Sequence, residues 1–120
     1  MLLPNGNRAI VDIRKLRDYC LNQDHPRGSR KARVFRATLG LTAVDAPKLR
    51  KRLLEVALSE EARLGEFDRY GQRYTIDFEI RVGMRAVTAR SGWIILRGEN
   101  APRLTSCYVM RKKRYGKAKN

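Results

Sequence analysis

Apolar residues recur at two different spacings along this chain of 120 residues, and the spacing changes after about residue 65. In the first half they recur every three or four residues, as in amphipathic helices, and in the second half every second residue, as in half-buried strands. The order of the two patterns predicts about three N-terminal helices followed by a roughly four-stranded antiparallel sheet. We therefore expect one α+β domain over residues 1–110, with the helices on one face of the sheet.

Capping residues mark the ends of the predicted helices. The first helix follows Asp12, a good N-cap, and ends at Leu21. The second is capped by Ser29 and stopped by Gly40, and the third begins near Asp45. The positions of the last two helices predicted to face the core are Ala32, Phe35, Leu39, Leu49, Leu53, Val56 and Ala57.

The strands are predicted from alternation and from turn residues. Residues 73–81 alternate strictly, a hairpin turn is expected at residues 82–84, and a strand follows at 86–89. Residues 90–92 are expected to form a bulge or a short turn before a central apolar strand at 93–96, which places Trp93 in the core. The last strand spans residues 103–110. Strict alternation would place one set of its side chains on one face, namely Leu104, Ser106, Tyr108 and Met110. The other set would lie on the opposite face, namely Thr105, Cys107 and Val109.

Charge is the strongest feature of the composition. The chain has 27 Lys and Arg against 12 Asp and Glu, a formal net charge of +15. Such an excess indicates a polyanionic partner, most commonly nucleic acid, although an ordinary charged surface or an acidic protein partner would also account for it. Residues 111–120 are predicted to be a disordered basic tail that adds electrostatic affinity.

The remaining composition argues against several other classes of protein. Cys20 and Cys107 lie far apart in the sequence, and with His25 as the only histidine they cannot form a zinc site, so we expect buried reduced thiols, no metal and no cofactor. Reduced thiols are typical of a cytoplasmic protein. No apolar run approaches the length of about 20 residues that a membrane span needs, so no membrane partner is expected.

Two segments carry residues suited to phosphodiester chemistry. His25 precedes Pro26 in a constrained turn, and Arg30 and Lys31 follow at a helix start, where backbone N–H groups also favour an anion. A histidine among fixed positive charges can move a proton while the charges hold a phosphate, although a lone histidine is more often a surface or core residue. The second segment contains Arg90 and the strand pair Ser106 and Tyr108.

The chain also resembles a known family. The residues that carry the resemblance are Tyr19-Cys20-Leu21-Asn22, His25-Pro26-x-Gly28-x-x-Lys31-Ala32-x-x-Phe35, Arg90-Ser91-x-Trp93 and Pro102-Arg103-Leu104-x-Ser106-x-Tyr108. They are similar to a family of small bacterial domains of unknown function, which occur alone beside a small partner gene or at the ends of polymorphic toxins. The likeness covers residues 3–109, and the family resembles more distantly the barnase, EndoU, colicin and RelE-like RNases, in which N-terminal helices precede a sheet that bears the active site.

The resemblance implies a metal-independent endoribonuclease toxin, held in check by a small, acidic antitoxin protein. It implies a catalytic set of His25, Lys31, Arg90, Ser106 and Tyr108, with His25 as general acid or base, and leaves open whether Thr105 replaces Ser106. Further RNA contacts are expected at Arg27, Arg30, Ser91 and Arg103. The alternative hypotheses are a non-catalytic RNA- or DNA-binding module and an interaction protein whose charge serves an acidic partner.

Overall fold

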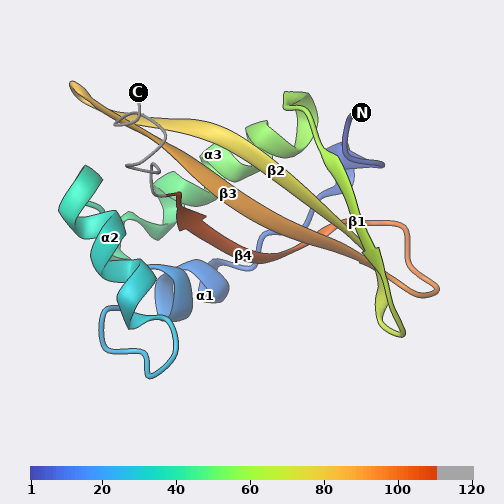
Figure 1. Ribbon diagram of the computed structural model, residues 1–120, viewed down its shortest axis with the longest axis horizontal. Coiled ribbons are helices and arrows are strands. Elements are labelled where there is room, and N and C mark those ends of the chain that lie inside the picture. Colours follow the sequence, from blue (N-terminus) through green and yellow to red (C-terminus); the bar gives the residue numbers. More distant parts are fainter. Residues whose placement is uncertain (111–120) are drawn as a thin grey trace, which may run out of the picture.

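The computed structural model describes residues 1–110 (Figure 1), so the predicted basic tail at residues 111–120 lies outside the described part of the chain. The helices come first. They are α1 (Ile13–Lys15), which continues as a π-helical turn η2 (Leu16–Cys20), α2 (Ser29–Leu39) and α3 (Ala46–Ser59), with short 3-10 turns η1 (Gly6–Arg8) and η3 (Ala43–Asp45). The strands follow as β1 (Arg63–Phe67), β2 (Gly71–Val82), β3 (Arg85–Leu96) and β4 (Arg103–Val109). The α+β class and the order of helices and strands are therefore as predicted.

The four strands form one antiparallel sheet in the order β1-β2-β3-β4. The predicted turn at residues 82–84 is confirmed, because β2 and β3 pair from Val82 opposite Arg85 down to Gly71 opposite Leu96. The prediction of separate strands at 86–89 and 93–96 is wrong, since both belong to β3. The strand missing from the prediction is β1, in which all five residues are exposed. An exposed edge strand has no apolar alternation from which it could be recognised.

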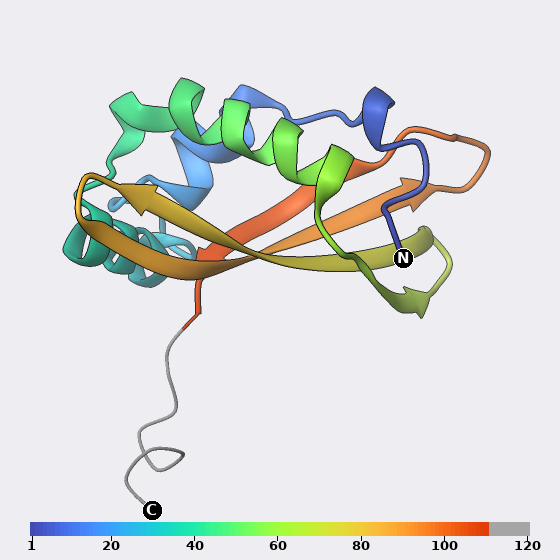
Figure 2. The same ribbon diagram turned by 90° about the horizontal axis from the view of Figure 1, so that it is seen from above.

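The core lies between the helices and one face of the sheet, as Figure 2 shows for α3. Phe35 of α2, Leu53 of α3 and Ile76 of β2 are fully buried there. Trp93 is 1 % exposed and belongs to the same core, as predicted. The seven helical positions predicted to face the core are all buried. We call the opposite side of the sheet, which faces the viewer in Figure 1, its polar face.

The predicted caps account for most helix ends. The Asp12 carboxylate accepts a hydrogen bond from the Arg14 N–H at 3.0 Å, and Thr42 and Asp45 form a reciprocal capping box before α3. Gly40 ends α2 with a left-handed φ of 73°, a conformation that glycine adopts without steric cost. One cap was wrongly predicted, because Gly28 is the N-cap of α2 and Ser29 is its first helical residue.

The described residues contain no helix that is both long and apolar enough to cross a membrane.

Candidate functional site

A row of polar side chains crosses the polar face of the sheet through Asp77 of β2, Arg90 of β3 and Tyr108 of β4. The three residues are direct cross-strand neighbours, since Asp77 is in register with Arg90 and Arg90 with Tyr108. Arg90 donates two hydrogen bonds to the Asp77 carboxylate, from Nε at 2.8 Å and from Nη2 at 3.0 Å. Arg63 of β1 donates a third to the same carboxylate at 3.1 Å. These bonds fix the plane of the Arg90 guanidinium beside the Tyr108 side chain.

The charges in this row stabilise one another. Hydrogen bonds from Arg90 first, and then from Arg63, hold the pKa of Asp77 below its usual value, against the opposing effect of partial burial. The bond to Asp77, with a smaller contribution from Tyr108, raises the pKa of Arg90 above its already high usual value. Both groups therefore stay ionised, and Arg90 is a fixed positive charge with one side directed toward Tyr108.

Helix α2 adds a second positive charge to this row. The Lys31 ammonium lies 4.2 Å from the centre of the Tyr108 ring, a cation–π contact. Lys31 belongs to the N-terminal turn of α2, next to the apolar stripe that buries Ala32 and Phe35 in the core. The burial of this apolar stripe anchors the helix beside β4, so Lys31 is brought to the sheet by packing rather than by its own charge.

A β-bulge in β4 places two hydroxyl groups beside Arg90. Gly92 pairs with Ser106 and Trp93 with Leu104, so that Thr105 has no partner on β3. A methyl group on Gly92 would meet the Thr105 Oγ1 at 2.8 Å and the Ser106 Oγ at 3.0 Å. Both hydroxyls therefore lie over the same glycine on the polar face. The Thr105 and Ser106 hydroxyls are therefore both near the polar row.

The bulge also overturns the predicted alternation in this strand. Leu104 was predicted to share a face with Ser106 and Tyr108, but it is buried in the core with Cys107 and Val109. The prediction was wrong because a bulge adds one residue to the strand, and every side chain on one side of it then changes face.

His25 lies in the loop before α2 and caps that loop through its ring. Its Nδ1 accepts hydrogen bonds from the backbone N–H groups of Arg27 and Gly28, both at 3.0 Å. The ring also packs edge-on against Tyr19 with 4.7 Å between the ring centres. Because Nδ1 accepts both bonds, the neutral ring carries its proton on Nε2, and Nε2 is the nitrogen left for other contacts. None of the hydrogen bonds or ring contacts found within residues 1–110 joins His25 to Lys31, Arg90 or Tyr108, so the structure does not bring His25 together with these predicted partners.

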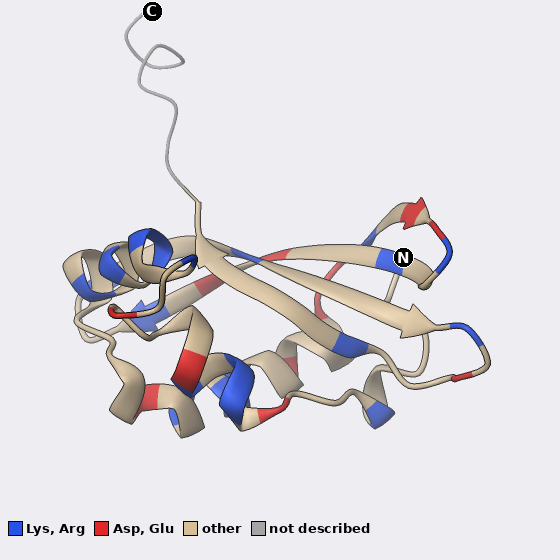
Figure 3. Cartoon of the chain, turned by 90° about the horizontal axis from the view of Figure 1, so that it is seen from below, with Lys and Arg blue, Asp and Glu red and all other residues tan. Residues whose placement is uncertain are grey.

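The surface of α2 carries a concentration of positive charge, seen in blue in Figure 3. Arg30, Lys31, Arg33 and Arg36 lie on this helix, which has no acidic residue, and Arg27 is exposed just before it. No ion pair found within residues 1–110 involves any of these five side chains. The predicted RNA contacts Arg27 and Arg30 therefore lie on an accessible basic surface adjoining Lys31.

Two other predicted RNA contacts do not join this site. Ser91 is fully buried on the core face, where its hydroxyl donates to the Ile76 carbonyl at 3.0 Å and accepts from the Trp93 indole at 2.9 Å. The prediction that Ser91 contacts RNA is therefore wrong, and the residue instead satisfies the buried tryptophan. Arg103 begins β4 opposite Ile94, which lies four residues along β3 from the partner of Tyr108 and hence about 13 Å away, and it pairs with Glu99 at 3.0 Å.

The two cysteines are free and buried, as predicted. Although they are distant in sequence, the structure brings them together between η2 and β4. Burial raises the pKa of the Cys20 thiol to about 11, opposed by a hydrogen bond with the Cys107 backbone. Burial also raises the pKa of Cys107 well above its usual value. Both thiols are therefore protonated packing groups.

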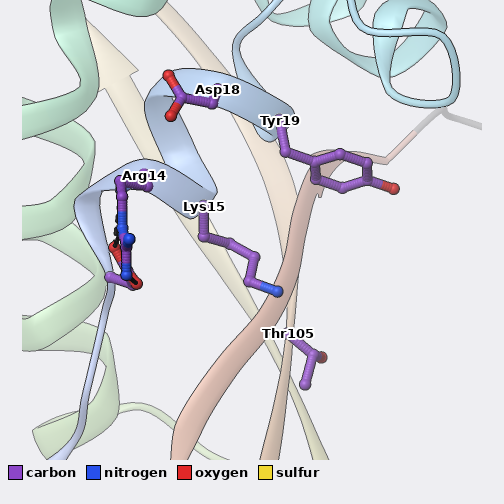
Figure 4. A pocket seen from close by; sticks show the side chains of 6 residues that line it. Arg14, Lys15, Asp18, Tyr19 and Thr105 are labelled. Atoms are coloured by element: carbon purple, nitrogen blue, oxygen red, sulfur yellow. Dashed lines mark hydrogen bonds and ion pairs between the residues drawn. The ribbon is translucent and has the colours of Figure 1, made fainter.

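An open pocket of about 570 Å³ lies where η2 faces the bulge of β4 (Figure 4). Its lining consists of Asp12, Arg14, Lys15, Asp18, Tyr19 and Thr105. Lys15 extends across it toward Thr105, the bulge residue whose hydroxyl also lies near Gly92. The pocket therefore adjoins the polar row at its β4 side.

Sequence reasoning missed Asp77 and Lys15, and it named Tyr19 only as part of the family resemblance, without a role in the site. A signal for Asp77 was present, because a two-residue turn at Gly83-Met84 places Asp77 opposite Arg90 by counting back along both strands. Lys15 and Tyr19 had no such signal, since they lie about ninety residues from Thr105 and meet it only through the packing of η2 on β4.

Comparison with known proteins gives one result. The model of the family "Domain of unknown function (DUF6883)" matches residues 2–111, and the chain belongs to this family. No curated protein and no solved structure shows significant similarity to the chain.

Proposed function

We propose that this member of the DUF6883 family is a metal-independent endoribonuclease that cleaves RNA by attack of a 2′-hydroxyl on the adjacent phosphate. The observation that carries the proposal is the joining of Lys31, Arg90, Tyr108 and the bulge hydroxyls on one accessible face. Cleavage of this kind needs positive charge on the phosphorane oxygens, and proton transfer at the attacking and leaving oxygens. The four parts of this cluster supply charge and hydroxyl groups within one strand pair and one helix turn.

The residues divide by their chemistry. Arg90 and Lys31 would hold the non-bridging phosphate oxygens, with Arg90 kept in orientation by Asp77. Tyr108 and the Ser106 or Thr105 hydroxyl would contact the ribose and its 2′-oxygen. As the 2′-oxygen attacks phosphorus, its proton would pass to a water molecule, and the Tyr108 phenol would protonate the departing 5′-oxygen and regain its proton from water. The reaction would leave a 2′,3′-cyclic phosphate on one fragment and a 5′-hydroxyl on the other.

In this proposal His25 donates a hydrogen bond and does not act as a general base. The two backbone N–H bonds at Nδ1 favour the neutral ring with its proton on Nε2. Such a ring donates a hydrogen bond to a phosphate or leaving oxygen, as a neutral electrophile does, and does not shuttle a proton. On this reading His25 is the donor rather than the general base.

The engagement of Nδ1 is also the observation that favours the second candidate, a non-catalytic RNA-binding module. If His25 serves only to cap the loop before α2, the same basic surface would grip phosphates without cleaving them. The two candidates make the same prediction for affinity and opposite predictions for product formation.

The test is incubation of the purified chain with total RNA in EDTA, followed by end-group analysis of any fragments. Fragments with 2′,3′-cyclic phosphate ends are expected, and Arg90→Ala or Lys31→Ala should slow their formation about 100- to 1,000-fold. Arg97→Ala is the matched control, because this exposed arginine stacks on Phe67 at the β1 side of the sheet. RNA that binds but stays intact would support the binding module instead.

We further propose that the activity makes the chain a cytoplasmic toxin restrained by a small acidic antitoxin protein. The support is the basic surface of α2, which carries four Lys and Arg residues and no acidic one and would attract an acidic protein as well as RNA. Expression of the chain alone should arrest bacterial growth, and Arg90→Ala should relieve the arrest. Arrest that persists in a variant shown to be inactive on RNA would contradict this proposal.

A further inference from the structure

We infer that the pocket between η2 and β4 is a subsite of the same RNA site, which binds the phosphate and base of a nucleotide flanking the cleaved linkage. The inference rests on the proposed function, because it extends that site along a single RNA strand. The pocket has a volume of about 570 Å³ and shares the bulge residue Thr105 with the polar row.

The charges within the pocket favour an anion. Both carboxylates of its lining are neutralised by arginines of the same segment, in two bidentate pairs. Arg14 donates to Asp12 from Nε at 3.1 Å and from Nη2 at 2.7 Å. Arg17 donates to Asp18 from Nε at 2.7 Å and from Nη2 at 2.9 Å. What remains is the charge of Lys15, which forms no ion pair with any carboxylate of residues 1–110.

Tyr19 supplies a fixed aromatic surface beside this charge. Its ring is held by the edge-on contact with His25, and Gly28 lies so close that a Cβ there would be 3.3 Å from two of the ring carbons. Lys15 and Tyr19 are four residues apart, so they lie on one side of the helical segment. A rigid aromatic ring next to a free ammonium suits a base and its phosphate, because stacking needs no particular base.

The position of the pocket indicates how a bound RNA strand would run across the protein. Lys31 and Arg90 lie near the end of β4, Ser106 and Thr105 lie at its bulge, and Lys15 extends toward Thr105 from the helical segment beside the strand. An RNA strand that follows β4 would meet the hydroxyl groups of the bulge together with the positive charges of Lys31, Arg90 and Lys15. This arrangement suits single-stranded RNA, whose bases are free to turn toward an aromatic ring.

The experiment measures binding without cleavage. A fluorescent hexanucleotide RNA with 2′-O-methyl riboses cannot be cleaved, and its affinity is followed by anisotropy between 50 and 200 mM salt, the range over which such contacts are screened. Lys15→Gln should reduce the slope of log K against log salt by about 0.7, the value for one phosphate contact on a single strand. Lys48→Gln is the matched control, an exposed lysine on α3, and should leave the slope unchanged.

A second measurement addresses the base. The same RNA with 4-thiouridine at each position in turn should photo-crosslink to Tyr19 from one flanking position only. Equal slopes for Lys15→Gln and Lys48→Gln, or displacement of the RNA by polyglutamate at the same charge concentration, would overturn the inference. Lys15-dependent binding without cleavage of natural RNA would refute the proposed endoribonuclease and leave the subsite standing. Cleavage of natural RNA that does not depend on Lys15 would refute the subsite and leave the proposed endoribonuclease standing.

Discussion

Replacing Asp77 by asparagine tests whether the polar row is held together by its one carboxylate. Asp77 accepts two hydrogen bonds from Arg90 and one from Arg63, and the side chains of Asp77 and Arg90 are 25 % and 34 % exposed. Charge-assisted bonds contribute about 1.5–3 kcal/mol each when shielded, and solvent screening at this exposure reduces the expected loss for Asp77→Asn to about 1–2 kcal/mol. This loss corresponds to a fall of roughly 3–8 °C in Tm.

The chain offers a matched control on the same strand and the same face. Glu79 lies two residues beyond Asp77, and its pair with Arg81 is about 60 % exposed on both sides. Exposed pairs of this kind contribute about 0–1 kcal/mol, so Glu79→Gln should change the free energy of unfolding little. Urea denaturation of both variants at pH 7 measures the difference directly.

The pH dependence gives the prediction a second, independent check. The folded pKa of Asp77 lies below its usual value of 3.8, so the stabilisation is complete above about pH 5 and is lost as the pH falls through the folded pKa. The difference between the original chain and Asp77→Asn should therefore shrink between pH 5 and pH 2. A difference that is no larger than that of Glu79→Gln, or that persists unchanged at pH 2, would refute the reasoning.

Three further predictions follow from the site. Gly92→Ala should displace the Thr105 and Ser106 hydroxyls, lower the free energy of unfolding by about 1 kcal/mol and reduce RNA cleavage; full cleavage would contradict it. His25→Ala should cost about 1 kcal/mol in thermal denaturation and His25→Asn less, because an asparagine oxygen also accepts backbone N–H bonds; equal losses would argue against the capping role. Cys20, with its pKa raised to about 11, should react with Ellman's reagent about 100-fold more slowly in the native chain than in urea; similar rates would show an accessible thiol.

The sequence predicted those parts of the fold that depend on local patterns. Apolar spacing identified the buried sides of α2 and α3, Gly40 marked the end of α2, and Asp45 marked the start of α3. Alternation identified β2, because one of its faces is buried along its whole length. Strand β1 was not predicted, because none of its residues is buried and an exposed strand lacks the alternation of apolar and polar residues by which a strand is recognised.

The residues of the candidate site were likewise predicted only in part from the sequence. The sequence singled out Lys31, Arg90, Ser106 and Tyr108 by their chemistry and by the family resemblance, and the structure brings these four to one surface. The structure also excludes Ser91 from this surface, because its hydroxyl is buried and accepts a hydrogen bond from the Trp93 indole. Ser91 is buried because it alternates with Ala89 and Trp93 on the core face of β3. This was missed because β3 was predicted as two strands divided at residues 90–92.

Local periodicity and composition were therefore enough to determine the class of fold, the buried sides of its main helices and its net positive charge. Only the tertiary structure decided which charges within residues 1–110 form ion pairs and which face the side chains of β4 take. One unpaired residue at the bulge of β4 moves Leu104 into the core and brings Thr105 beside Ser106. The packing of η2 on β4 brings Lys15 to Thr105 across about ninety residues of chain. Contacts of that range depend on register and packing, and both are properties of the whole fold.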